Sequence, residues 1–155
     1  MIGLAGFAGL WALSRRIEDA RAGQVSVLEG TARFAGDGAG LTCDEAGTLH
    51  VPGQPPMAAT RRYLWRETGG GIAVLFADGR AFHRFDPAGG APGDTHHCRP
   101  DTYVVTYDFT RWPRWRARWR VTGPGKDYVM VSCYAPFAGA ETEKLGLEGK
   151  EWPIR

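Results

Sequence analysis

Short stretches of alternating apolar and polar residues make up most of this chain, and clusters of glycine, proline and aspartate separate them. Alternation with a period of two is typical of β-strands with one buried face, and the clusters are typical of turns. Helical periodicity is weak, and only one short helical turn is expected, near Ile2–Ala8. The pattern predicts nine strands, over Leu10–Ile17, Gln24–Phe34, Gly40–His50, Ala58–Arg66, Gly71–Ala77, Arg80–Asp86, Thr102–Phe109, Arg114–Val121 and Tyr128–Tyr134.

Short connections between successive strands indicate an antiparallel meander, because only antiparallel neighbours can be joined by tight turns. Nine strands in one sheet leave exposed edges unless the sheet closes, so we expect a single up-and-down β-barrel over residues 1–136. A β-sandwich is the alternative fold. The length of 155 residues fits one such domain, and residues 137–155 are expected to form a tail or strap.

The strand Arg114–Val121 has the clearest alternation in the sequence. Its apolar members, Trp115, Ala117, Trp119 and Val121, are expected to face the interior, which puts four arginines on the outside. These arginines either pair with carboxylates on neighbouring strands or form a patch for an anionic partner such as nucleic acid. An inverted strand, with one or two arginines inside to bind a carboxylate or phosphate, is the third option.

The segment Phe7–Trp11 contains a Gly-x-Trp sequence that resembles the opening of lipocalin-like barrels, in which the tryptophan closes the bottom of the barrel. Three further stretches, within Phe82–Asp86, His96–Tyr103 and Trp119–Tyr128, resemble an uncharacterised bacterial family with a calycin-type fold. The resemblance covers roughly Phe7–Tyr134. It implies a lipocalin-like barrel plugged by Trp11, and it implies no particular substrate.

A hairpin around the loop Pro87–Asp94 would gather His83, His96 and Cys98 on one face, with His83 opposite Cys98. Imidazole and thiolate ligands suit zinc, or iron in a haem, so these three residues are the candidate metal site. The alternative, which we favour, is that the imidazoles are hydrogen-bonded to a carboxylate or the backbone and Cys98 is a small buried apolar residue. A role for His83 in contacting a ligand lies between these interpretations.

A second group of candidates combines aromatic rings with a few polar groups, which is the usual composition of a small-molecule site. An ordinary aromatic core is an equally good interpretation. The predicted ligand-binding residues are Arg61, Tyr63, Trp65, His83, Tyr103, Tyr107 and Tyr128.

The leading hypothesis is therefore a protein that binds a small, partly aromatic ligand, with an anionic group as an option, inside the barrel. The first alternative is a lyase, isomerase or hydrolase in which His83 is the acid or base and Asp86 or Asp101 orients it. The second alternative is haem or metal binding through His83, His96 or Cys98. No sequence motif identifies a cofactor or decides whether the chain is an enzyme.

Composition and charge limit the partners and the compartment. A net charge of +2 is too near neutral to favour nucleic acid, and a homodimer is left open. Three cysteines without a close pair indicate reduced thiols and a cytoplasmic protein. The apolar N-terminal stretch of about 13 residues is too short to span a bilayer, and Arg15 and Arg16 follow it, which is the reverse of a signal peptide.

Overall fold

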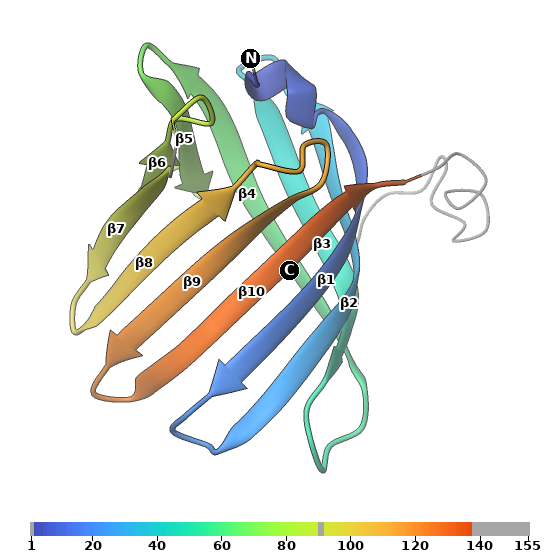
Figure 1. Ribbon diagram of the computed structural model, residues 1–155, viewed down its shortest axis with the longest axis vertical. Coiled ribbons are helices and arrows are strands. Elements are labelled where there is room, and N and C mark those ends of the chain that lie inside the picture. The colour runs from blue at the N-terminus through green and yellow to red at the C-terminus, as the bar shows by residue number, and fades with distance from the viewer. Residues whose placement is uncertain (1, 90–91, 138–155) are drawn as a thin grey trace.

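Ten antiparallel strands form one strongly curled sheet in a computed structural model that describes residues 2–89 and 92–137 (Figure 1). The nine predicted strands are all present, with ends within two residues of the prediction, and a tenth strand, β7, joins them. The expected helical turn is a 3-10 helix, η1. The elements are η1 (Leu4–Phe7), β1 (Gly9–Asp19), β2 (Gln24–Gly36), β3 (Leu41–His50), β4 (Met57–Thr68), β5 (Gly71–Phe76), β6 (Ala81–Phe85), β7 (Gly93–Cys98), β8 (Asp101–Asp108), β9 (Trp115–Gly123) and β10 (Lys126–Pro136).

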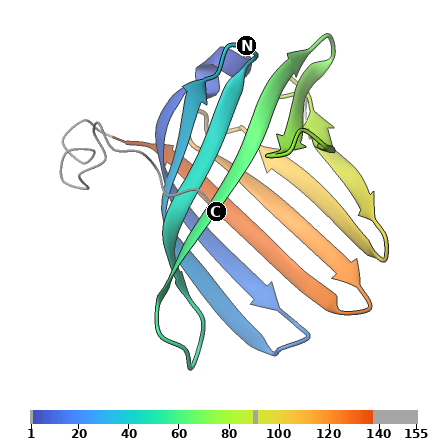
Figure 2. The ribbon, with the colours of Figure 1, turned by 180° about the vertical axis from the view of Figure 1, so that it is seen from behind.

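The strands follow an up-and-down order, β6-β5-β4-β3-β2-β1-β10-β9-β8-β7, and every ladder in it is antiparallel. The pairing of β1 with β10 brings the first and last strands together in the middle of the sheet order. Figure 2 shows the wall formed by β2, β3 and β4 from behind. The predicted antiparallel up-and-down barrel is thus confirmed, and it is nearly closed.

The two edge strands of the sheet, β6 and β7, face each other across a seam that has no backbone ladder. The backbone N–H of Arg84 donates to Asp94 Oδ2 at 2.9 Å, so a side chain bridges the gap where a ladder bond is missing. On the other side of β6, Val74 lies opposite His83 and Leu75 opposite Ala81. Phe82 is therefore the extra residue of a β-bulge, and both Phe82 and His83 contact the interior residue Trp119.

The expected hairpin between β6 and the segment after Pro87 is wrong. Cys98 lies opposite Asp101 on β8, and β7 forms its ladder with that strand alone. The physical reason is the connection length, because a two-residue turn at Arg99 and Pro100 joins β7 to β8, whereas a longer loop separates β6 from β7.

An aromatic plug closes the end of the barrel at which η1 lies. Phe7 is completely buried at its centre, within 6.2 Å of the ring centroids of its aromatic neighbours. Trp11 is also buried there, as the resemblance to lipocalin-like barrels implies, and its Nε1–H donates to the backbone oxygen of Phe7 at 2.8 Å. Trp11 thus fixes η1, and Phe7 fills the space.

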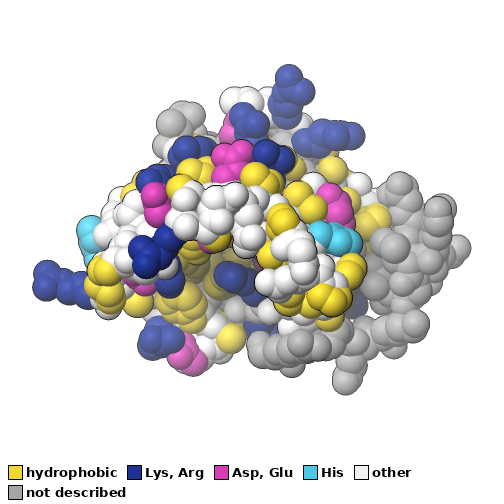
Figure 3. Space-filling model, turned by 90° about the horizontal axis from the view of Figure 1, so that it is seen from below, with side chains coloured by type: hydrophobic (Ala, Val, Ile, Leu, Met, Phe, Trp, Pro, Cys, Tyr) yellow, Lys and Arg dark blue, Asp and Glu magenta, His cyan; other side chains and the backbone are white. Residues whose placement is uncertain are grey.

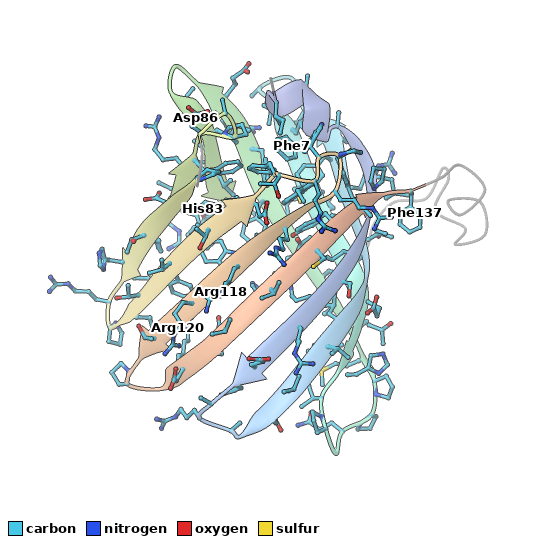
Figure 4. All side chains as sticks on the ribbon, in the orientation of Figure 1. Phe7, His83, Asp86, Arg118, Arg120 and Phe137 are labelled. Atoms are coloured by element: carbon cyan, nitrogen blue, oxygen red, sulfur yellow. The ribbon has the colours of Figure 1, made fainter. Side chains whose placement is uncertain are left out.

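The predicted orientation of β9 is confirmed. Trp115, Ala117, Trp119 and Val121 are buried, and the arginines between them lie on the outer face (Figure 4). Two of these arginines pair with carboxylates of the neighbouring strands, Arg116 with Asp108 at 3.3 Å and Arg120 with Asp127 at 2.6 Å. The outward stripe is therefore partly neutralised by its own sheet.

The predicted tail or strap lies outside the described residues, except for Phe137, whose N–H donates to the backbone oxygen of Leu10 at 3.2 Å. In the part of the chain that the structure describes, no helix has the length and apolar character needed to cross a membrane.

Candidate functional site

A cavity of about 70 Å³ lies inside the barrel below the aromatic plug. Figure 3 views the opposite, open end and shows a hollow with hydrophobic and basic side chains inside it. The structure brings all the predicted ligand-binding residues to the lining of this cavity: Arg61, Tyr63, Trp65, His83, Tyr103, Tyr107 and Tyr128. They come from β4, β6, β8 and β10, because each is on the inward face of its strand.

A buried ion pair lines one side of the cavity. Arg15 Nη2 donates to both carboxylate oxygens of Glu45, at 2.9 and 3.0 Å, and Arg15 Nε donates to Ser132 Oγ at 2.7 Å. The Tyr134 hydroxyl donates to Glu45 Oε2 at 2.8 Å. Since both charges are neutralised within the protein, this cluster supplies polarity to the cavity wall without a net charge.

His83 and Tyr107 form a second buried polar pair, with His83 Nε2 2.7 Å from the Tyr107 hydroxyl oxygen. Burial lowers the pKa of His83 to about 3 and raises the pKa of Tyr107 well above 10, so both groups are neutral at pH 7. The Tyr107 hydroxyl has no other acceptor among the described residues, so we assign its hydrogen to His83 Nε2. The remaining ring proton is then on Nδ1, a buried atom without a hydrogen-bond partner in the described structure.

Arg61 lies at the mouth of the cavity, where its Nη1 donates to the Tyr63 hydroxyl at 3.2 Å. No carboxylate within residues 2–89 and 92–137 forms an ion pair with it, in contrast to Arg15. The guanidinium is always protonated at physiological pH. Arg61 is thus the cavity residue with an uncompensated positive charge.

Tyr103 and Tyr128 line the same end of the cavity, where Lys126 Nζ donates to the Tyr103 hydroxyl at 2.8 Å and pairs with Asp101 at 3.0 Å. These two contacts, first the Tyr103 hydroxyl and then Asp101, raise the pKa of Lys126. Asp101 therefore neutralises the nearest lysine.

The structure does not bring His83 together with either carboxylate proposed to orient it. Asp101 lies six residues before Tyr107, a distance of about 20 Å along a strand. Asp86 is exposed near the loop after β6 (Figure 4). With its pKa near 3, His83 is also unprotonated at pH 7, which disfavours it as a general acid.

The candidate metal ligands His83, His96 and Cys98 are not gathered at one point. Cys98 is exposed at the end of β7, His83 is buried, and the ring of Phe82 packs between the two imidazoles, with centroids at 4.7 and 5.2 Å. Across the described residues, no three His, Cys, Asp or Glu side chains are close enough together to hold a metal ion.

Sequence reasoning missed the buried pair of Arg15 and Glu45, although it contained a signal for both. Arg15 continues the inward series Trp11, Leu13 on β1, and Glu45 follows Cys43 by two residues on β3. A charged residue at an inward position of a strand needs a partner inside the barrel. Arg15 was considered only as a residue that follows the apolar N-terminal stretch, so no partner inside the barrel was predicted for it.

No relative of this chain was found among curated proteins. Among solved structures, the S-type phycobiliprotein lyase CPES from Guillardia theta is similar in fold, with a TM-score of 0.60 at 8% identity, over 88% of this chain and 91% of that one. A protein of unknown function from the DUF3598 family of Nostoc punctiforme matches more weakly, with a TM-score of 0.45 at 12% identity, over 86% of this chain and 48% of that one. Residues 7–136, the whole barrel with its plug, match the family of unknown function DUF6314, and the chain belongs to this family.

Proposed function

We propose that this protein binds a small ligand inside the barrel, and that the ligand combines a planar ring with an anionic group. The observation that carries the proposal is Arg61, a positive charge that lines the cavity without a carboxylate partner in the described structure. Arg61 is exposed at the mouth of the cavity, so an anion entering from solvent can reach its guanidinium. Hydrogen bonds between arginine and a carboxylate are among the stronger ones in proteins, and a carboxylate on the ligand would supply them here.

Aromatic side chains support the planar part of the proposal. Trp65, Trp115 and Trp119 line the inner part of the cavity, and Tyr63 and Phe82 line its outer part. Flat rings gain from stacked and edge contacts with one another beyond the burial of their area. Hydrogen bonding with the unpartnered His83 Nδ1 would fix a polar atom of the ligand ring.

The size of the cavity limits the ligand. A volume of about 70 Å³ has room for roughly two water molecules at the ~30 Å³ that each occupies in the liquid. A compact aromatic acid therefore requires some movement of the side chains at the mouth. Those side chains, Tyr63, Phe82, Tyr103 and Tyr128, are only half-buried, whereas Trp65, His83 and Tyr107 deeper inside are fully buried.

Calorimetric titration with benzoate and with its neutral analogue benzamide tests this proposal. We expect benzoate to bind more tightly than benzamide, and Arg61→Gln to weaken benzoate binding about 10- to 100-fold, as expected for a hydrogen bond to a charged group. Arg118→Gln, which removes an outward arginine, is the matched control and leaves binding unchanged. Equal affinity of wild type and Arg61→Gln for benzoate would refute the proposed role of the charge.

We also propose a reducing, cytoplasmic location. The thiols of Cys43, Cys98 and Cys133 are all unpaired, which supports the proposal, since reduced thiols are typical of proteins in that compartment.

A further inference from the structure

The ring of Phe82 sits in an aromatic box beside the cavity. It is stacked on Trp119, with centroids 4.9 Å apart and planes at 11°, and on Phe76, at 4.5 Å and 21°. His83 and His96 meet it edge-on, at 4.7 and 5.2 Å and at 89° and 88°. Tyr63 is also stacked on Phe82, at 5.8 Å and 23°, and Tyr103 meets it edge-on at 6.2 Å. Flat faces and ring edges of this kind are the surroundings that a planar guest prefers.

Trp119 and Phe76 are each stacked on Phe82, yet the two make no ring contact with each other among the aromatic pairs of the described residues. We infer from this that they lie on opposite faces of the Phe82 ring. The Phe82 ring thus fills a slot that is one ring thick. Because Trp119 lines the cavity, emptying the slot would join its space to the cavity.

The backbone that carries Phe82 is held less firmly than the rest of the barrel wall. Strand β6 has five residues, forms a ladder only with β5, and lies at the seam, which the Arg84–Asp94 hydrogen bond bridges. Phe82 is the extra residue of the β-bulge and is half-buried. A side chain in this position is able to swing out without breaking a ladder bond.

We propose that Phe82 is a built-in occupant of the stacking position, and that a planar ligand binds by displacing this ring and stacking on Trp119 in its place. The proposal rests on the proposed function and specifies it further. The proposed ligands are flat, conjugated acids with more than one ring. The cavity has no room for them while Phe82 is in place. Acids with a puckered ring do not fit a slot that is one flat ring thick.

Removal of Phe82 tests the displacement. If the slot is empty in about 1–10% of wild-type molecules, Phe82→Ala makes it permanently available and tightens the binding of naphthoate about 10- to 100-fold. Cyclohexanecarboxylate, a puckered acid, gains no such increase. Phe109 is a half-buried ring that contacts Phe7 in the plug, with centroids 5.8 Å apart, and does not line the cavity. Phe109→Ala therefore leaves naphthoate affinity at the wild-type value. Phe82→Leu, which keeps apolar bulk without a flat face, covers the case in which the alanine variant is poorly folded, and an intermediate gain is expected.

Fluorine NMR of protein with para-fluorophenylalanine at position 82 observes the displacement itself. We expect saturating naphthoate to move the resonance from the shielded position of a stacked ring to that of a solvent-exposed one. An unmoved resonance at saturation, or naphthoate affinity that does not increase in Phe82→Ala and Phe82→Leu, overturns the proposal. If wild type binds no aromatic acid but Phe82→Ala binds naphthoate, the slot is supported and the proposed function of the wild-type protein is refuted. If neither wild type nor any variant binds, both the slot and the proposed function are refuted.

Discussion

The free energy of unfolding depends strongly on the buried pair of Arg15 and Glu45, and Glu45→Ala tests this dependence. The side chains of Arg15 and Glu45 are 9% and 7% exposed, and Glu45 accepts three hydrogen bonds, two from Arg15 and one from Tyr134. Removal of the carboxylate leaves a guanidinium buried without compensation. We expect the free energy of unfolding to fall by about 3–5 kcal/mol, the usual cost of breaking a buried pair on one side.

Urea denaturation followed by tryptophan fluorescence measures this loss. Asp108→Ala is the control, because it breaks the exposed pair with Arg116 and is expected to cost only about 0–1 kcal/mol. The double variant Arg15→Met/Glu45→Leu removes both charges and is expected to be more stable than Glu45→Ala. A loss below about 1 kcal/mol for Glu45→Ala would show that Arg15 is not dependent on its partner.

Three further predictions follow from single contacts. The pKa of His83 is about 3 in the folded protein and 6.5 in the unfolded chain. Below pH 6.5 unfolding therefore takes up a proton, and the free energy of unfolding decreases as the pH is lowered. Between pH 7 and pH 5 wild type is expected to lose about 2 kcal/mol more than His83→Gln in urea titrations, and equal losses would contradict the buried neutral ring. Trp11→Phe removes the donor to the Phe7 carbonyl and is expected to cost about 1–3 kcal/mol in thermal unfolding. The control is Trp112→Phe, which is expected to cost less because Trp112 is a half-buried neighbour of Phe7 whose indole N–H forms no hydrogen bond among the described residues. Cys43 is 2% exposed and its pKa is raised by burial, so we expect it to react with a thiol reagent far more slowly than the other two cysteines, and equal rates would refute its burial.

Period-two alternation was sufficient to predict most of the barrel, because one face of each strand is buried and the other is exposed to solvent. On β9 it assigned Trp115 and Trp119 to the interior, and on β4 it put Arg61, Tyr63 and Trp65 on one face. Those assignments depend only on the pleat of a strand, which is a local property.

The contacts at the seam could not be predicted in this way. A β-bulge shifts the alternation by one residue, so the pattern cannot show that Phe82 and His83 both contact Trp119. The meeting of β6 and β7 at a seam without a ladder depends on the curl of the entire sheet. The partnership of Arg15 with Glu45 likewise connects β1 and β3 across β2, beyond the reach of any local pattern.

A crystal structure of the protein with naphthoate tests the central claim most directly. The account predicts naphthoate inside the barrel, with its carboxylate on Arg61, its ring stacked on Trp119 and Phe82 displaced toward the seam. Naphthoate bound only on the outer surface, with Phe82 still stacked on Trp119 and the interior unchanged, would contradict it.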